Sequence, residues 1–279
     1  MQEPRKSFPI IRNVMKPRFG MNLYNQLKRE LGEIDASAEC LELAMREFID
    51  ASKLALNSTT FIQQLSAKHN VRVDVFDTAL FVRRGAALRI IGVTQSFEGF
   101  LDAFIETHPR IRDKEGRKRG EPLLDFIVRK MGVPRDTADR FTDGLDYKLY
   151  GYYRRLRNGI AHQVMPTQLA TASFVLSPLQ TATHDDPRYV RLKAPNDPEG
   201  LTFDDYVLFS RSAKAVAAQL CQIGGLSEEE IIEWLEAKRD RSGLQSRQAN
   251  NVRTLLRIAC GLDREEAEVF VAKMKLTGQ

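Results

Sequence analysis

Apolar residues recur every three or four positions along most of this chain of 279 residues, a spacing typical of amphipathic helices. The strongest stripe lies in 86–107, and its helix should stop before Pro109. Helical periodicity begins near Met21. Weaker stripes predict further helices over 35–57, with Asp35 as a plausible N-cap, and over 122–131, 144–159, 202–223, 227–240, 246–260 and 263–275. Residues 71–76 alternate apolar and polar, which favours one short strand without an evident partner. The pattern therefore predicts an all-α fold.

Prolines and glycines divide this pattern into three parts. We expect an N-terminal arm and helical extension over 1–70, a central helical bundle over 71–224, and a C-terminal satellite of three helices over 225–279. The satellite has a strong helix start, because Ser227 precedes three glutamates. Residues 166–200 contain several prolines and predict a long irregular connection, which is typical of a functional flap or an insertion.

Composition narrows the function classes. Hydrophobic residues make up 43% and charged residues 28%, which indicates a globular protein rather than a disordered or fibrous one. The net charge of +5 is compatible with a nucleic-acid partner without requiring one. Three widely spaced cysteines without a C-x-x-C pair argue against a disulfide framework and a zinc site. No apolar run reaches the roughly 18 residues of a membrane span, so we expect a cytoplasmic protein that needs no membrane and no cofactor.

One basic, tyrosine-rich segment, 148–162, carries the candidate chemistry. Near its end stand Arg157 and Asn158, and the segment finishes at His162. Four residues separate Arg157 from His162. This motif resembles the hallmark of the HEPN superfamily, a group of helical nucleic-acid-associated domains: an arginine, often followed by asparagine, then a histidine at the end of an amphipathic helix. The segment 96–101 is similar to the first core helix of many such domains. The resemblance covers about 86–223 and implies a HEPN-like helical bundle.

The resemblance also implies an activity, that of a metal-independent RNA endonuclease acting as a toxin or antiviral defence effector. In such an enzyme the 2′-OH of the RNA attacks the phosphate, and the products carry 2′,3′-cyclic phosphate and 5′-hydroxyl ends. His162 would move the proton, because the pKa of an imidazole lies near working pH. Arg157 would stabilise the charge of the phosphorane, and Asn158 would orient His162 or a phosphate.

The spacing within the motif constrains its geometry. Arg157 and His162 are five residues apart, which is about 140° around a regular helix, so the two side chains would not share one face. Either the helix ends at Gly159 and redirects His162, or two copies of the motif meet across a two-fold axis. The resemblance implies the second arrangement, a homodimer with a composite site.

Three further residues, Arg154, Arg155 and Tyr153, are candidate nucleic-acid contacts. The two arginines could follow an RNA backbone or simply solubilise the exposed face of the helix, and Tyr153 lies at the margin of the buried stripe. Val164 stands where some HEPN toxins carry a tyrosine that a nucleotidyltransferase antitoxin modifies, so that regulation is not expected; a protein antitoxin or another regulator stays open. Two rival functions remain: a non-catalytic RNA- or nucleotide-binding module, and a helical scaffold for protein interaction.

Overall fold

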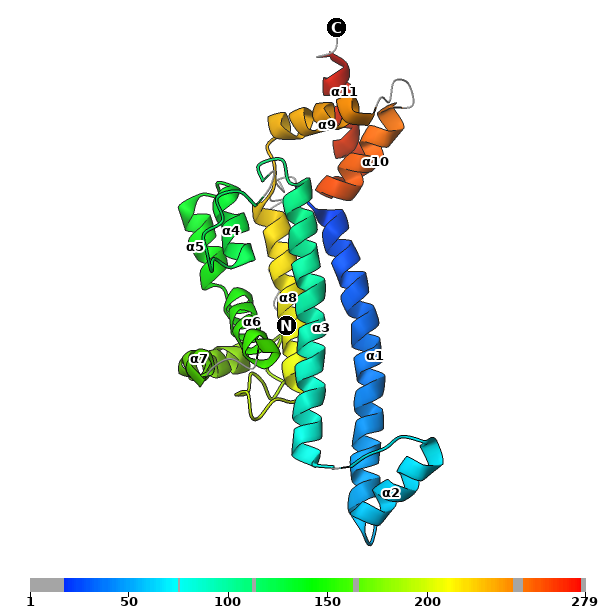
Figure 1. The fold of residues 1–279 in the computed structure, drawn as a ribbon. Helices are drawn as coiled ribbons and strands as arrows, with labels where there is room; N and C mark the ends of the chain where they lie inside the picture. Colours follow the sequence, from blue (N-terminus) through cyan, green and yellow to red (C-terminus); the bar gives the residue numbers. More distant parts are fainter. Residues whose placement is uncertain (1–17, 75, 112–113, 163–165, 243–247, 277–279) are drawn as a thin grey trace, which may run out of the picture.

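The computed structural model describes residues 18–74, 76–111, 114–162, 166–242 and 248–276, and within these ranges every regular element is a helix (Figure 1). The all-α fold predicted from the sequence is confirmed. The helices are, in chain order, α1 (Met21–Leu54), α2 (Ser58–His69), α3 (Thr78–Thr107), α4 (Leu123–Lys130), α5 (Arg135–Asp143), α6 (Leu145–His162), α7 (Pro166–Asp185), α8 (Phe203–Ile223), α9 (Glu228–Ser242), α10 (Gln248–Cys260) and α11 (Arg264–Leu276).

Three long helices, α1, α3 and α8, run side by side and form the main bundle, and α6 packs against α3 and α8 (Figure 1). Their shared core includes Leu31 of α1, Phe97 of α3 and Phe209 of α8, all fully buried. The helix α1 is therefore part of the bundle. The prediction that residues 1–70 form an extension separate from the bundle is therefore wrong for α1, because the apolar stripe of α1 is covered by α3 and α8.

The helical structure predicted to begin near Met21 is confirmed, because α1 starts at that residue. The predicted boundary with Asp35 as the N-cap of a separate helix is wrong, since α1 is continuous through that position. Asp35 lies in the middle of α1 and accepts hydrogen bonds from the hydroxyls of Tyr206 and Ser210 on α8. The carboxylate of Asp35, which resembles a helix cap in the sequence, thus joins α1 to α8, because its oxygen accepts hydrogen bonds from the neighbouring helix.

At one end of the bundle, α1 and α3 extend beyond α8 and are joined by α2. The caps of α2 and α3 are Asn57 and Asp77, whose side chains accept hydrogen bonds from the backbone N–H of Thr60 and Leu80. The strand predicted over 71–76 is not present in the described part of that segment, because no second strand is there to pair with its backbone.

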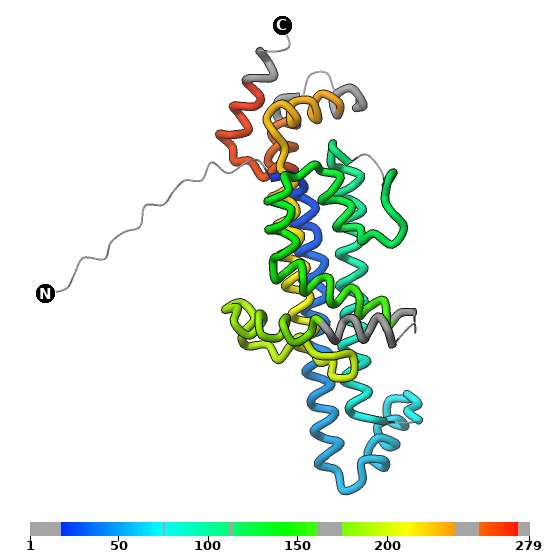
Figure 2. The backbone as a smooth tube through the Cα atoms, turned by 90° about the vertical axis from the view of Figure 1, so that its left-hand side faces the viewer, coloured from blue at the N-terminus to red at the C-terminus, as the bar shows by residue number. Residues whose placement is uncertain are grey.

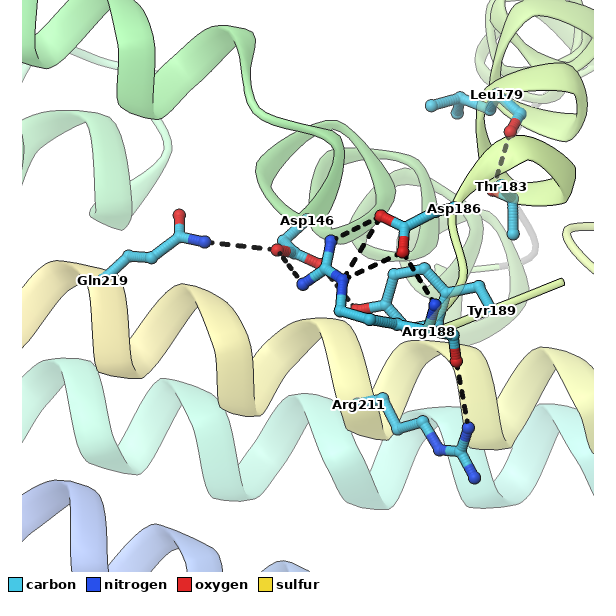
Figure 3. A network of polar contacts seen from close by, with 8 residues as sticks. All are labelled: Asp146, Leu179, Thr183, Asp186, Arg188, Tyr189, Arg211 and Gln219. Carbon is cyan, nitrogen blue, oxygen red and sulfur yellow. Dashed lines mark hydrogen bonds and ion pairs between the residues drawn. The ribbon is translucent and has the colours of Figure 1, made fainter. Parts of the chain in front are cut away.

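The predicted long connection after residue 166 is wrong for its first half, where α7 forms. Pro166 occupies the first helical position, where its missing N–H is not needed, and Pro178 is exposed within the helix. Only 186–202 is irregular, and it is fixed to the bundle. Its Arg188 and Tyr189 both donate hydrogen bonds to the buried carboxylate of Asp146 on α6 (Figure 3).

The C-terminal helices α9, α10 and α11 form a satellite with its own core, at the end of the bundle opposite α2 (Figures 1 and 2). Trp234 of α9 belongs to this core, and Phe19 from the segment before α1 inserts into it, with its ring 5.4 Å from the ring of Trp234. Arg110 and Glu230 form a two-pronged ion pair, with both N–O distances 2.6 Å, between the bundle and the satellite.

Candidate functional site

Helix α6 carries the candidate site, and its sequence fixes which side faces the core. Leu149, Tyr152 and Leu156 lie three or four residues apart and are completely buried against the bundle. Asp146 lies in the first turn, where a negative charge stabilises a helix N-terminus. This buried stripe leaves the end of α6, with Arg157 and Asn158, at the edge of the packed core.

The guanidinium of Arg157 is held loosely by two neighbours. Its Nη1 donates a hydrogen bond to Oδ1 of Asn158 at 3.1 Å, and its Nη2 lies 3.7 Å from Oε2 of Glu98 on α3. The Arg157 side chain is 20% exposed. Its Nε is buried and has no hydrogen-bond partner among the described residues. Arg157 is therefore positioned by two helices, and the described side chains leave part of its donor capacity without a partner.

Polar side chains from three helices lie along this side of α6 and act on the buried hydroxyl of Tyr150. We call them the α6 polar cluster, which consists of Glu98 of α3, Asp125 of α4, and Tyr147, Arg154, Arg157 and Asn158 of α6. The hydroxyl of Tyr147 donates to Asp125. Tyr150 forms the floor, with its ring 4.7 Å from that of Phe97, and burial raises its pKa well above the ordinary value. The charges of Arg154 and Arg157 act in the opposite direction on Tyr150. The tyrosines are therefore neutral, and the arginines supply the cationic charge of the cluster.

Helix α6 continues through Gly159 to His162. The alternative in which the helix ends at Gly159 and redirects His162 is therefore wrong. On this unbroken backbone, Arg157 and His162 stay about 140° apart. The His162 side chain lies outside the described residues, so its distance from Arg157 is not part of the site described here.

Tyr153, predicted to contact RNA, is a core residue, and this prediction is wrong. Its side chain is fully buried, and its hydroxyl donates a hydrogen bond to Asp205 Oδ1 at 2.9 Å. The ring packs on Phe209 of α8 at 5.0 Å between centroids. The tyrosine lies on the α8 side of α6, away from the solvent that RNA would occupy.

The two remaining candidates, Arg154 and Arg155, are partly buried along α6. Arg154 is close enough to Tyr147 and Tyr150 to act on their pKa values. Nε of Arg155 is buried without a hydrogen-bond partner in the described part of the chain. Contact of either arginine with nucleic acid stays a prediction.

Sequence reasoning missed a polar network centred on the buried Asp205 of α8. Its carboxylate accepts hydrogen bonds from Tyr153, from both the backbone and side-chain nitrogens of Asn196, and from the backbone N–H of Thr202. Burial raises the pKa of Asp205, and these hydrogen bonds oppose that effect. Thr202 and Asp205 form a capping box, a motif of a hydroxyl residue and an acidic residue three positions later that is readable in the sequence.

Two other features bear on the chemistry. Across the described side chains, no group of three or more His, Cys, Asp or Glu residues is arranged to hold a metal ion. The described helices include none that is long and apolar enough to cross a membrane.

Comparisons of the chain with protein-family models, curated proteins and solved structures give no match. The site must therefore be interpreted from its own residues. A guanidinium beside the amide of Asn158 is suited to bind an oxyanion such as a phosphate, because arginine offers several donors in a fixed plane.

Proposed function

We propose that this protein is a metal-independent RNA endonuclease of the HEPN type, with Arg157 and His162 as catalytic residues and Asn158 in support. The observation that carries the proposal is the state of Arg157. Two helices position its guanidinium at the end of α6, yet its contact with Glu98 is long and its Nε has no hydrogen-bond partner among the residues that the structure describes. A substrate phosphate would complete its donor set.

The proposed reaction needs only the RNA and these side chains. The 2′-oxygen bonds to phosphorus while a neutral His162 imidazole accepts its proton. The bond from phosphorus to the 5′-oxygen then breaks, and that oxygen takes up the proton from the His162 imidazolium, which returns to its neutral form. The guanidinium of Arg157 stabilises the negative charge on the non-bridging oxygens throughout. The products are a 2′,3′-cyclic phosphate and a 5′-hydroxyl.

The geometry of α6 supports a composite site between two copies of the chain. Because α6 is unbroken, positions 157 and 162 of one chain lie about 140° apart around the helix axis. Two copies related by a two-fold axis would bring two arginines and two histidines to one RNA strand. The proposal therefore includes a homodimer, and predicts that mixing Arg157→Ala and His162→Ala chains restores part of the activity through mixed dimers.

The test uses end-labelled RNA with purified wild type, Arg157→Ala and His162→Ala in the presence of EDTA. Arg135→Ala is a matched control, because the Arg135 side chain is 95% exposed on α5. We expect cleavage with cyclic-phosphate ends by wild type and Arg135→Ala, and a loss of at least 100-fold in both motif variants. Cleavage unchanged in the motif variants would overturn the assignment.

The same experiment separates the rival functions. Binding of RNA that depends on Arg157, without cleavage by wild type, would indicate a non-catalytic RNA- or nucleotide-binding module. Neither binding nor cleavage would indicate a protein-interaction scaffold. In cells, a toxin or defence effector should arrest growth when expressed, and either alanine substitution should relieve the arrest. A protein antitoxin would be a partner that restores growth without changing the motif.

A further inference from the structure

Five tyrosines are buried in the described part of the chain, and the hydroxyl of one of them differs from the rest. Four of the five donate a hydrogen bond to a carbonyl or carboxylate oxygen of the fold: Tyr152, Tyr153, Tyr189 and Tyr206. Tyr150 is only 4% exposed, yet its hydroxyl donates no hydrogen bond to a described residue. A phenylalanine would fill the same space without burying a polar group, so packing alone does not explain this hydroxyl.

The ring of Tyr150 is held between two other helices. Its centroid lies 4.7 Å from that of Phe97 on α3 and 6.3 Å from that of Phe209 on α8. The Tyr150 oxygen is not among the described polar atoms that are completely enclosed without a partner, so a small part of the hydroxyl is accessible. A donor whose position is fixed by packing binds a ligand without the loss of conformational freedom that a flexible side chain suffers.

Two arginines stand on the same face of α6 as Tyr150. Arg154 and Arg157 follow it by four and seven residues, and side chains at these spacings lie one above another along a helix. Helical side chains lean toward the N-terminus, so the long side chain of Arg157 extends toward Tyr150. The two also meet α3 at neighbouring residues, since Arg157 contacts Glu98 and the Tyr150 ring contacts Phe97. The three α6 residues therefore form a row of donors.

The carboxylates whose charges act on Tyr150 interact with other groups. Asp125 accepts a hydrogen bond from the hydroxyl of Tyr147, and Glu98 faces the guanidinium of Arg157. Burial raises the pKa of Tyr150, so its hydroxyl keeps the proton at neutral pH and can donate it in a hydrogen bond. On the same helix face as two guanidiniums, which only donate, this hydroxyl suits an oxyanion.

We propose that Tyr150 is a further catalytic residue, whose hydroxyl donates a hydrogen bond to a non-bridging oxygen of the phosphodiester that Arg157 binds. This inference rests on the proposed ribonuclease function and adds a neutral donor to that site. The Tyr150 proton stays on its own oxygen throughout, so the proton transfers of the reaction are unchanged. Because negative charge on the non-bridging oxygens grows as the phosphorane forms, the hydrogen bond strengthens in the transition state and accelerates cleavage.

The test compares Tyr150→Phe with Tyr153→Phe, which is the same change at another buried position of α6. The probes are an end-labelled RNA for cleavage and the same RNA with every 2′-hydroxyl methylated for binding, because methylation removes the nucleophile. We expect Tyr150→Phe to cleave about 10-fold more slowly and to bind the methylated RNA about 3-fold more weakly, with an unchanged urea midpoint. Tyr153→Phe should cleave and bind as wild type does but unfold in less urea, because it loses the bond to Asp205.

A sulfur substitution in the RNA locates the contact. Sulfur at one non-bridging position of the cleaved phosphate accepts hydrogen bonds poorly, so wild type should cleave one of the two stereoisomers more slowly than the unmodified RNA. That slowing should be smaller in Tyr150→Phe, because the hydrogen bond that it reports is already absent. It should be unchanged in Tyr153→Phe. A merely structural role of Tyr150 would leave the effect of sulfur as it is in wild type.

The outcomes separate this inference from the function on which it rests. If wild type cleaves RNA and Tyr150→Phe cleaves it equally well, the Tyr150 contact is overturned and the ribonuclease proposal stands. Slower cleavage with a lowered urea midpoint and an unchanged sulfur effect would make Tyr150 a structural residue and would also overturn the contact. If wild type does not cleave, the ribonuclease proposal fails and binding decides. Weaker binding of methylated RNA by Tyr150→Phe alone supports the contact, and equal or absent binding overturns it.

Discussion

Polar groups on the two sides of helix α6 differ in how completely they are hydrogen-bonded. On the side of α8, the hydroxyl of Tyr153 and the carboxylate of Asp146 are buried and fully engaged, with Asp146 receiving hydrogen bonds from three residues (Figure 3). On the side of α3, the described residues give Arg157 one long ion pair and leave its Nε without a hydrogen-bond partner. The first side therefore stabilises the fold, while the second retains capacity for a ligand.

The difference follows from the free energy of burying polar groups. A buried polar group without partners destabilises a fold by about 1–3 kcal/mol, so a network such as that of Asp205 acquires a donor for nearly every lone pair. Arg157, at the edge of the core, is still partly hydrated, so an incomplete donor set there is tolerated. Arg155 of the same helix also has a buried Nε without a partner in the described part of the chain, so the combination of incomplete pairing with the neighbouring Asn158 and Glu98 is what distinguishes Arg157.

The largest expected effect on stability comes from Asp205→Ala, which removes the acceptor at the centre of the Asp205 hydrogen-bond network. This change leaves the donors of Tyr153, Asn196 and Thr202 buried without an acceptor, and should lower the free energy of unfolding by about 4 kcal/mol. Urea unfolding followed by circular dichroism measures it. Asp204→Ala is the control, since Asp204 accepts one hydrogen bond from the backbone of Lys193; a similar loss there would contradict the special role of Asp205.

The buried imidazole of His108 should make the free energy of unfolding depend on pH. Burial lowers its pKa to about 4, and its ring contacts the carbonyl of Gly224 at 3.0 Å and the backbone N–H of Arg110. Between pH 6.5 and about 4, His108 binds a proton in the unfolded chain but not in the folded chain, so the free energy of unfolding falls as pH decreases. The loss is about 3 kcal/mol. Below that range, Glu230 adds a further loss, because its ion pair with Arg110 lowers its pKa to about 2.

Fluorescence of Trp234, the single tryptophan of the chain, reports on this junction. Urea unfolding at pH 7 and pH 4 should show the destabilisation in wild type, and His108→Gln should reduce it, because glutamine does not titrate. An equal pH effect in His108→Gln would exclude His108 as its source.

Tyr153→Phe removes the hydrogen bond to Asp205 on the α8 side of α6 and keeps the aromatic ring. We expect a loss of about 1 kcal/mol in the free energy of unfolding, since Asp205 keeps its other donors. RNA cleavage should proceed at the wild-type rate. A selective loss of RNA binding in this variant would restore Tyr153 as an RNA contact.

The smallest expected effect on stability belongs to Arg157, the residue for which we propose a catalytic role. Arg157→Ala removes a partly exposed side chain with a 3.7 Å ion pair, and should change the free energy of unfolding by less than about 1 kcal/mol. The same unfolding measurement tests it beside the cleavage assay. A loss as large as that of Asp205→Ala would mean that Arg157 is a structural residue.

Much of the fold is readable from helical periodicity, because a helix is a local structure whose apolar stripe repeats every three or four residues. The stripes of α3 and α8 and the satellite helix start at Ser227 are examples. Local rules failed where a distant partner decided the outcome. Asp35 resembles a cap but binds Tyr206 on α8, and Pro166 resembles a helix breaker but begins α7.

The sequence alone determined the helical class, the amphipathic register of α6 and the presence of arginine, asparagine and histidine near its end, since all of these depend on neighbours within a few residues. Only the tertiary structure decided that Tyr153 is buried on Asp205, that Glu98 from another helix contacts Arg157, and that the hydroxyl of Tyr150 has no hydrogen-bond partner among the described residues. Those outcomes depend on which helices pack together, and packing joins residues that lie far apart in the chain.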